Sequence, residues 1–328
     1  MDNKIKVCTI GGGTGMPVIN QALVRAGFKN IKSIVTTFDN GGDTGRIRTD
    51  ERGKVLAFSD YWRALISLWN DGEQKSVWEE MLRYRDGKER NFGNVFFQFM
   101  SEKTGNLSDV DSLFCKLTGA SLEGKVIPVS LSPADICFST ISGKKYFGEH
   151  YLDDQRMSQD YVNNIWLEPE VEANPEAIET ISNSDVIIVC PGSVYGSLIT
   201  NFLPKGMKKA FAESKAKKIL MVNVMLTANE NLIKNQADYL KTFEKYLEAE
   251  FDIILMADVS KLDQDKLKKV YGFYAMENST PVEYSDKCRI KTDLADIVTI
   301  DENNWRLRHS ETKLADYFAK MDLCHKKD

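Results

Sequence analysis

The chain has 328 residues, and its 43 Lys and Arg against 48 Asp and Glu give a net charge of −5 at pH 7. This length allows one large α/β domain or two smaller ones, and the lack of a basic excess argues against nucleic acid as a partner. The opening stretch MDNKIKVCTI is unlike a signal peptide, and no apolar run approaches the roughly 20 residues of a membrane span. We therefore expect a cytoplasmic protein with no membrane partner.

Cysteine and histidine usage narrows the possible chemistry. The six cysteines contain no C-x-x-C pair, which favours free thiols in a reducing compartment. The three histidines are His150, His309 and His325, so a His-rich metal site cannot be built, and none lies beside an obvious nucleophile. Any chemistry is expected to depend on carboxylates and backbone amides.

From the N-terminus, short apolar runs alternate with helical patterns. KIKVCTI ends at the triple glycine Gly11–Gly13, and the amphipathic stretch after it ends at Gly27, a typical glycine at a helix C-terminus. IKSIVTTF is a second apolar run that ends at Asp39, and capped helical patterns follow from Ser59. This order predicts a strand, a glycine loop, a helix and a strand, followed by an α-rich block.

The pattern changes at about residue 125. Short β-type runs separated by Ser, Pro, Gly and Asn predict a small antiparallel insert over about 125–170, either a lid or an oligomer contact. SDVIIVC, KKILMVNVM and FDIILMADV are near-continuous apolar runs, typical of parallel strands covered on both faces, and a closing helix is expected at about 310–322. We expect one α/β domain over 1–328, a three-layer Rossmann-like, doubly wound and mainly parallel sheet with a small antiparallel β insert.

The first glycine loop is the first candidate binding element, because ligands of such sheets bind outside the carboxyl ends of the strands. Gly11, Gly12, Gly13 and Thr14 place consecutive amides at a helix N-terminus, where unpaired N–H groups favour an anion such as phosphate. The loop lacks the Lys-Ser/Thr of a Walker A motif, and Met16 stands where a dinucleotide fingerprint has its third glycine. The glycines could instead serve close backbone packing.

The second loop, FDNGGDTGRIR, follows the second predicted strand. Gly41 and Gly42 leave the backbone open, and Arg46 offers planar donors suited to phosphate or carboxylate. Asp39 at the strand end could hold a ribose hydroxyl or a hard cation. Asp60, near a helix start, is a further candidate, although it could equally be an N-cap.

The third loop, CPGSVYGS, again joins an apolar strand to a helix. Gly192 and Ser193 expose amides and a hydroxyl, and Tyr195 could stack on a ligand or pack in the interior. Asn223 ends the next strand and Asn94 lies in NFGN; either amide could bind a base edge or cap a turn. Two anion sites facing one crevice favour a ligand with more than one phosphate.

Taken together, these motifs resemble the CofD/YvcK family. The matching stretches are GGGTG, DNGGDTGRIR, NFGN, PGSVYGS, NVM, and a terminal R-H with K-L four residues on, in order from about Lys6 to Phe318. The family contains the 2-phospho-L-lactate transferases of coenzyme F420 synthesis and the bacterial gluconeogenesis factors. The resemblance implies a Rossmann-like fold and a homodimer.

The two branches of the family imply two activities. The transferase branch uses Mg²⁺ to move a phospholactyl group from a GDP-activated donor to a deazaflavin alcohol, and the YvcK branch binds UDP-sugars and supports carbon metabolism and cell shape. By resemblance, Asp39 and Asp60 match the catalytic, metal-handling aspartates of the transferases. The residues that match the nucleotide-diphosphate cradle are Gly11, Gly12, Gly13, Thr14, Gly192 and Ser193.

Details of the second loop favour the YvcK branch, because its glycines and Arg46 resemble that branch more closely. Asn40 is neutral where the family usually has a second acid, which removes one ligand charge from an Mg²⁺ site. An arginine of the family pattern is displaced to Arg63, about 100° round the helix. We therefore predict a UDP-sugar-binding protein, with an Mg²⁺-dependent phosphotransferase as the alternative; the missing third glycine disfavours an NAD-dependent oxidoreductase.

Overall fold

A parallel sheet of seven strands forms the centre of the computed structural model, which describes residues 5–39, 56–70, 72–105, 107–154, 157, 159–230, 232–284, 290–301 and 304–321. Across the sheet the strands are β12 (Ile290–Thr292), β10 (Ile253–Ala257), β8 (Lys217–Met221), β7 (Val186–Val189), β1 (Val7–Gly11), β2 (Ile31–Val35) and β3 (Gly124–Pro128). Every neighbouring pair in this sheet is parallel. The predicted mainly parallel, Rossmann-like sheet is confirmed.

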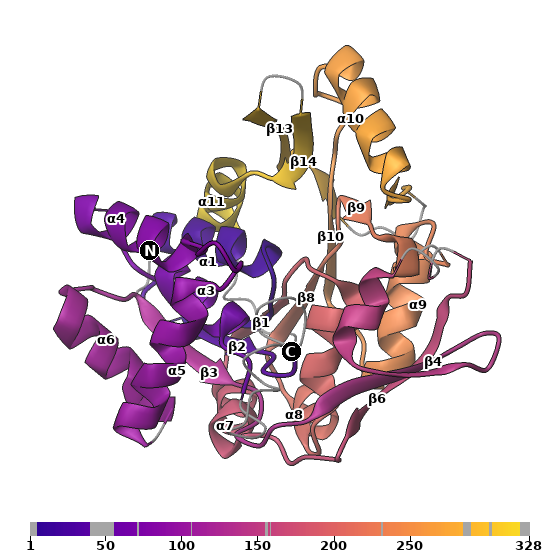
Figure 1. Ribbon diagram of the computed structural model, residues 1–328. Coiled ribbons are helices and arrows are strands. Elements are labelled where there is room, and N and C mark those ends of the chain that lie inside the picture. Colours follow the sequence, from indigo (N-terminus) through magenta and orange to yellow (C-terminus); the bar gives the residue numbers. More distant parts are fainter. Residues whose placement is uncertain are drawn as a thin grey trace.

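The strand order reverses beside β1 (Figure 1). From β1 the chain adds β2 and β3 on one side, then returns to place β7, β8, β10 and β12 on the other. The loops that leave β1 and β7 therefore diverge from a common point at the carboxyl edge. In doubly wound sheets this point is where ligands bind.

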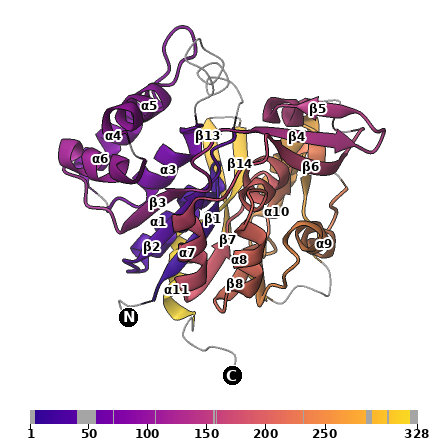
Figure 2. The ribbon, with the colours of Figure 1, turned by 90° about the horizontal axis from the view of Figure 1, so that it is seen from below.

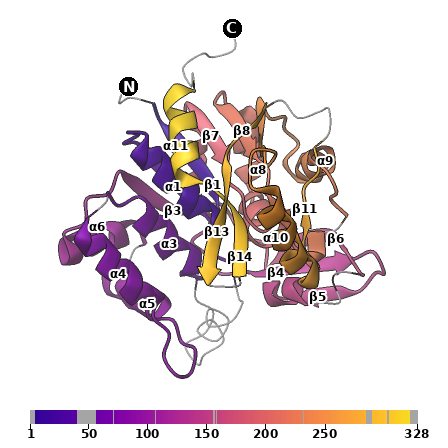
Figure 3. The same cartoon turned by 90° about the horizontal axis from the view of Figure 1, so that it is seen from above.

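Helices cover both faces of the sheet, which makes the three layers. Figure 2 looks onto the face covered by α7 and α8, and Figure 3 onto the face covered by α1, α10 and α11. The helices are α1 (Gly15–Arg25), α3 (Ser59–Ser67), α4 (Glu73–Arg83), α5 (Phe92–Thr104), α6 (Val110–Thr118), α7 (Pro175–Asn183), α8 (Met207–Glu213), α9 (Gln236–Leu247), α10 (Gln264–Met276) and α11 (Glu311–Lys320). The buried apolar residues form one cluster on each face of the sheet.

The two larger antiparallel units attached to this core are the β insert and a C-terminal hairpin. β4 (Asp135–Thr140) pairs with β5 (Lys145–Phe147) and β6 (Val162–Glu168), which is the expected β insert. The insert is shorter than the 125–170 span suggested by the sequence, because β3 belongs to the central sheet. The second unit is the hairpin of β13 (Ala295–Asp301) and β14 (Asn304–His309), which directly precedes α11.

A buried polar network fixes α3 against the sheet. The Asn20 side chain bonds the hydroxyls of Thr9, Ser33 and Ser67 at 2.9–3.0 Å, so it joins α1, β1, β2 and α3. Thr9 and Ser33 share a further bond of 2.8 Å. Because buried polar groups are costly when unpaired, this network specifies where α3 lies. That placement matters because α3 carries Asp60.

Two further sequence predictions concern thiols and membranes. Cys8, Cys115, Cys137 and Cys190 are free thiols, whereas Cys288 and Cys324 lie outside the described residues. Among the described helices, none is long and apolar enough to cross a membrane.

The short β9 (Met225–Leu226) and β11 (Thr280–Pro281) form one more antiparallel pair beside the carboxyl edge.

Candidate functional site

The glycines of the β1 loop allow the protein's own atoms to approach its backbone. A Cβ on Gly12 would lie 2.2 Å from Asp60 Oδ2, and a Cβ on Gly15 would lie 2.1 Å from the carbonyl oxygen of Pro191. Gly13 has a φ of 63°, in the left-handed region that favours glycine. The glycines therefore bring the β1 loop, the β7 loop and α3 into direct contact at the switch point.

Asp60 supplies the carboxylate that contacts the β1 loop. It lies in the first turn of α3, is only 6% exposed, and accepts a hydrogen bond from the backbone N–H of Gly13. Burial raises its pKa to about 6, against the lowering effect of Arg63, whose guanidinium is 3.6 Å from the carboxylate. The neighbouring Asp39 adds a further upward shift.

Asp39 and Glu149 form a second acidic contact. Asp39 follows β2 and accepts a 2.7 Å hydrogen bond from the Ser59 hydroxyl. Glu149 begins the short helix η2 (Glu149–Asp153) of the β insert, and it is hydrogen-bonded to Asp39. Burial raises the Glu149 pKa to about 9, and repulsion from Asp39, Asp153 and Asp60 adds to that shift. The insert thus supplies carboxyl groups to the edge of the site.

The carboxylate oxygens of these acidic residues are suitable ligands for a hard cation such as Mg²⁺. Carboxylates are the ligands that Mg²⁺ prefers, and Mg²⁺ typically uses only one or two of them with several waters and substrate phosphates. Within the described residues, however, no three His, Cys, Asp or Glu side chains are grouped so that they could hold a metal together. The assignment of Mg²⁺ to Asp39 and Asp60 therefore remains a prediction.

The third loop binds back onto itself and its neighbours. Asn223 clamps Gly192, accepting from its N–H at 2.9 Å and donating to its carbonyl at 2.8 Å. Ser193 accepts the N–H of Gly196 at 3.1 Å. Glu230 accepts the N–H of Val194 at 2.6 Å. The Gly192 amide, which the sequence analysis offered to an anion, is thus engaged by a side chain of the protein itself, as are the amides of Val194 and Gly196.

Tyr195 and Asn94 are buried beside the site. Tyr195 is 6% exposed, and burial raises its pKa above the ordinary tyrosine value. Asn94, in α5, accepts a 3.0 Å hydrogen bond from Trp62 Nε1 and is 5% exposed. Both pack in the interior, and contact of either with a ligand remains a prediction. Gly41, Gly42 and Arg46 lie outside the described residues.

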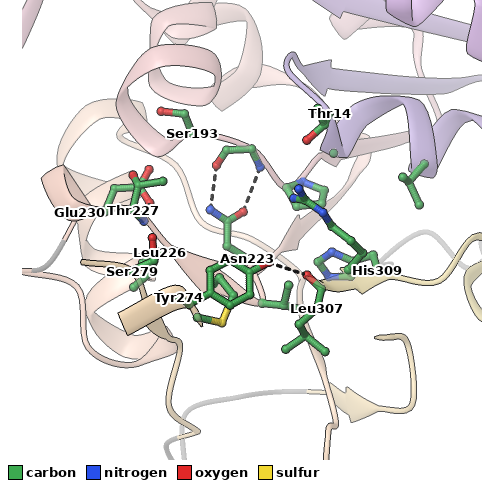
Figure 4. A pocket seen from close by; sticks show the side chains of 17 residues that line it. Thr14, Ser193, Asn223, Leu226, Thr227, Glu230, Tyr274, Ser279, Leu307 and His309 are labelled. Carbon is green, nitrogen blue, oxygen red and sulfur yellow. Dashed lines mark hydrogen bonds between the residues drawn. The ribbon is translucent and has the colours of Figure 1, made fainter. Parts of the chain in front are cut away.

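A pocket of about 230 Å³ opens between the β1 and β7 loops and the C-terminal hairpin (Figure 4). Its lining combines apolar side chains with hydroxyl, carboxyl, imidazole and guanidinium groups. The lining residues are Thr14, Gly15, Val18, Pro191, Gly192, Ser193, Asn223, Val224, Met225, Leu226, Thr227, Glu230, Tyr274, Ser279, Leu307, Arg308 and His309. The loops after β1, β7 and β8 therefore meet in one pocket. Of the predicted site residues, Thr14, Gly192, Ser193 and Asn223 line it, whereas Asp39 and Asp60 lie outside its lining.

Some of these groups were not among the predicted site residues. Arg308 and His309 were noted only as part of the terminal R-H motif, and the structure places them at the end of β14, in the pocket wall. Tyr274 donates to the Leu307 carbonyl at 3.2 Å, which ties α10 to the same wall. Glu149 and Glu230 carry no local sequence signal, because each is placed by contacts with loops distant in the chain.

The parallel sheet, its switch point and the pocket at its carboxyl edge define a Rossmann-like α/β protein with a candidate ligand pocket. Residues 7–301 match the family model described as 2-phospho-L-lactate transferase CofD. Because the match spans most of the chain, the protein belongs to this family.

Relatives of similar length carry a second family name. The gluconeogenesis factors of Listeria monocytogenes and Bacillus subtilis are 29% and 28% identical to this chain, and the alignments cover 98% and 87% of it and 96% and 87% of the relatives. A protein of Aquifex aeolicus is 30% identical over 97% of both chains. The crystal structure of a Bacillus halodurans protein, at 24% identity, matches with a TM-score of 0.82 over 97% of this chain and 100% of that one. That likeness confirms the fold.

Proposed function

We propose that this protein binds a sugar-linked nucleoside diphosphate of the UDP-sugar type at the carboxyl edge of its sheet, and that binding serves carbon metabolism and cell shape. The convergence of the β1, β7 and β8 loops on one pocket carries this proposal. The gluconeogenesis-factor names of full-length relatives support it. A homodimer, as the resemblance implies, is part of the same proposal.

The size and polarity of the pocket indicate which part of such a ligand would lie inside it. Its volume of about 230 Å³ is below the usual range of small-molecule sites and suits a nucleoside, so the sugar would lie outside it. Thr14 and Ser193 offer hydroxyls where the diphosphate would pass between the loops. Arg308 offers a guanidinium, and among the described residues it has no acidic partner within ion-pair distance.

Arg308→Gln is expected to weaken binding of UDP-N-acetylglucosamine by roughly 10- to 100-fold, because a charge-assisted bond to a phosphate is lost. Isothermal titration calorimetry measures the two affinities. Arg83→Gln is the matched control, since Arg83 pairs with Glu79 on the outer helix α4 and should leave binding unchanged. Stabilisation of the wild type by NAD but not by UDP- or GDP-containing ligands would refute the proposal.

The second candidate function is an Mg²⁺-dependent phosphotransferase of the 2-phospho-L-lactate transferase type. The family description and the acidic groups at the site favour it. Asp39 and Asp60 would hold the cation, which would neutralise the diphosphate during transfer. Thr14 and Ser193 would orient the donor, so that an acceptor hydroxyl attacks phosphorus in line.

Asp39→Asn separates the two candidates. If the cation binds there, GDP should raise the unfolding temperature of the wild type more with Mg²⁺ than without it. The variant should lose this extra rise with Mg²⁺ and keep the rise that GDP produces without metal. Thermal unfolding with GDP and with UDP-N-acetylglucosamine, with and without Mg²⁺, measures the metal-dependent and the metal-independent stabilisation. An unchanged Mg²⁺ response in the variant would reject Asp39 as a ligand. Metal-independent stabilisation by the UDP-sugar alone would favour the binding protein.

A further inference from the structure

His309 is a half-buried pocket residue whose side chain the protein leaves incompletely hydrogen-bonded. It ends β14, lines the pocket beside Arg308, and lies on the Val222 side of the cavity, next to the Asn223 clamp (Figure 4). Its Nε2 is buried and has no hydrogen-bond partner within the described part of the chain. A buried unpaired nitrogen is costly, so it requires an explanation such as a bound group.

The ring is held in its neutral form. Burial lowers the pKa of His309 to about 4, and the positive charge of Arg308 lowers it further, against the hydrogen bond to the Val222 backbone. A neutral imidazole has one N–H donor and one bare acceptor nitrogen. Because the donor faces the Val222 carbonyl, the remaining nitrogen can only accept a hydrogen bond.

Two other acceptor side chains in the pocket wall already accept hydrogen bonds from the backbone. The Glu230 carboxylate accepts the backbone N–H groups of Val194 and Thr227 through its two oxygens, at 2.6 and 2.9 Å. The Asn223 carbonyl accepts the N–H of Gly192. A ligand that donates a hydrogen bond is therefore expected to meet His309 rather than these two side chains.

We propose that His309 selects the base of the bound nucleotide by accepting a hydrogen bond from a ring N–H, as uracil and guanine offer and cytosine and adenine do not. This inference rests on the proposed function, because it assumes that the nucleoside occupies the pocket. Uracil carries a hydrogen on N3 and guanine on N1, whereas the corresponding nitrogens of cytosine and adenine are themselves acceptors. Two facing acceptors leave both unpaired.

The test is the ratio of affinities for matched nucleotides. In calorimetry at pH 7.5, wild-type protein should bind UDP roughly 10- to 100-fold more tightly than CDP, and GDP more tightly than ADP, since an unpaired buried acceptor is costly. His309→Phe should reduce both ratios to about threefold or less through weaker UDP and GDP binding. His309→Gln, which keeps an acceptor, should retain part of the preference.

The readout separates base selection from a structural role. His150→Phe is the matched control, because that histidine lies in η2 against Tyr151 and does not line the pocket, so it should keep the wild-type ratios. A purely structural role for His309 would lower all four affinities together and leave the ratios intact, which would overturn the inference. Equal UDP and CDP affinities in the wild type would overturn it while the proposed function stands. No binding of any of the four nucleotides would refute the proposed function itself.

Discussion

Gly15→Ala is expected to lower the free energy of unfolding by roughly 2–4 kcal/mol. The new Cβ would lie 2.1 Å from the carbonyl oxygen and 2.7 Å from the carbonyl carbon of Pro191. These are backbone atoms of the β7 loop, so no rotamer change relieves the overlap, and the β1 and β7 loops must separate. Because both loops line the pocket, nucleotide binding should fall with stability. Urea unfolding and calorimetry on one preparation measure the two effects.

Gly272→Ala is the matched control for this substitution. Gly272 lies in the interior of α10, and nothing is within 4 Å of a Cβ built on it. Alanine has the higher helix propensity, so this variant should gain roughly 0.5–1 kcal/mol. A Gly15→Ala protein with the urea midpoint of the wild type would mean that the two loops are not in the close contact described here.

The glycine loop shows what a sequence can predict about such contacts and what it cannot. Three successive glycines indicate that something approaches the backbone closely, but a ligand and the protein's own chain leave the same signature. The structure shows that Asp60 approaches Gly12 of this run, and that Pro191 approaches Gly15 just after it. These partners lie 48 and 176 positions further along the chain, and no local pattern encodes them.

The central sheet was predictable because buried parallel strands form near-continuous apolar runs. The hairpin before α11 was not, since β14 (Asn304–His309) alternates aromatic, basic and aliphatic residues and only Leu307 is fully buried. The same stretch, read without tertiary partners, resembles a polar approach to the closing helix. Arg308 and His309 therefore reach the pocket from an element that the sequence alone did not indicate.

The acidic groups show a similar limit. Asp39 and Asp60 were predicted from their places at a strand end and a helix start. In the structure Asp39 accepts a hydrogen bond from Ser59, the residue before Asp60, and its charge raises the pKa of Asp60. Glu149 could not be predicted, because only the fold of the β insert carries it to Asp39. The contact between Glu149 and Asp39 places the insert at the edge of the site.

Glu149→Gln is expected to stabilise the protein at alkaline pH and to flatten its dependence of stability on pH. The Glu149 pKa is raised from 4.5 in the unfolded chain to about 9 in the folded protein. A group with a raised folded pKa contributes fully below its unfolded pKa, and that contribution is lost as pH rises toward the folded pKa. As pH rises above about 4.5, the wild type should therefore lose stability progressively relative to the variant.

Glutamine resembles the protonated acid, and its amide can still donate a hydrogen bond to Asp39. The variant should therefore keep the contact with Asp39 and no longer need to bind a proton at this position. At pH 8 in the presence of a chelator, it should exceed the wild type by roughly 1–3 kcal/mol, and at pH 5 the two should be nearly equal. Urea titrations at several pH values measure the difference. Glu80→Gln on the exposed surface of α4 is the control and should follow the wild-type profile. A Glu149→Gln profile parallel to the wild type would contradict the raised Glu149 pKa, because the carboxyl would then bind protons equally in the folded and unfolded states.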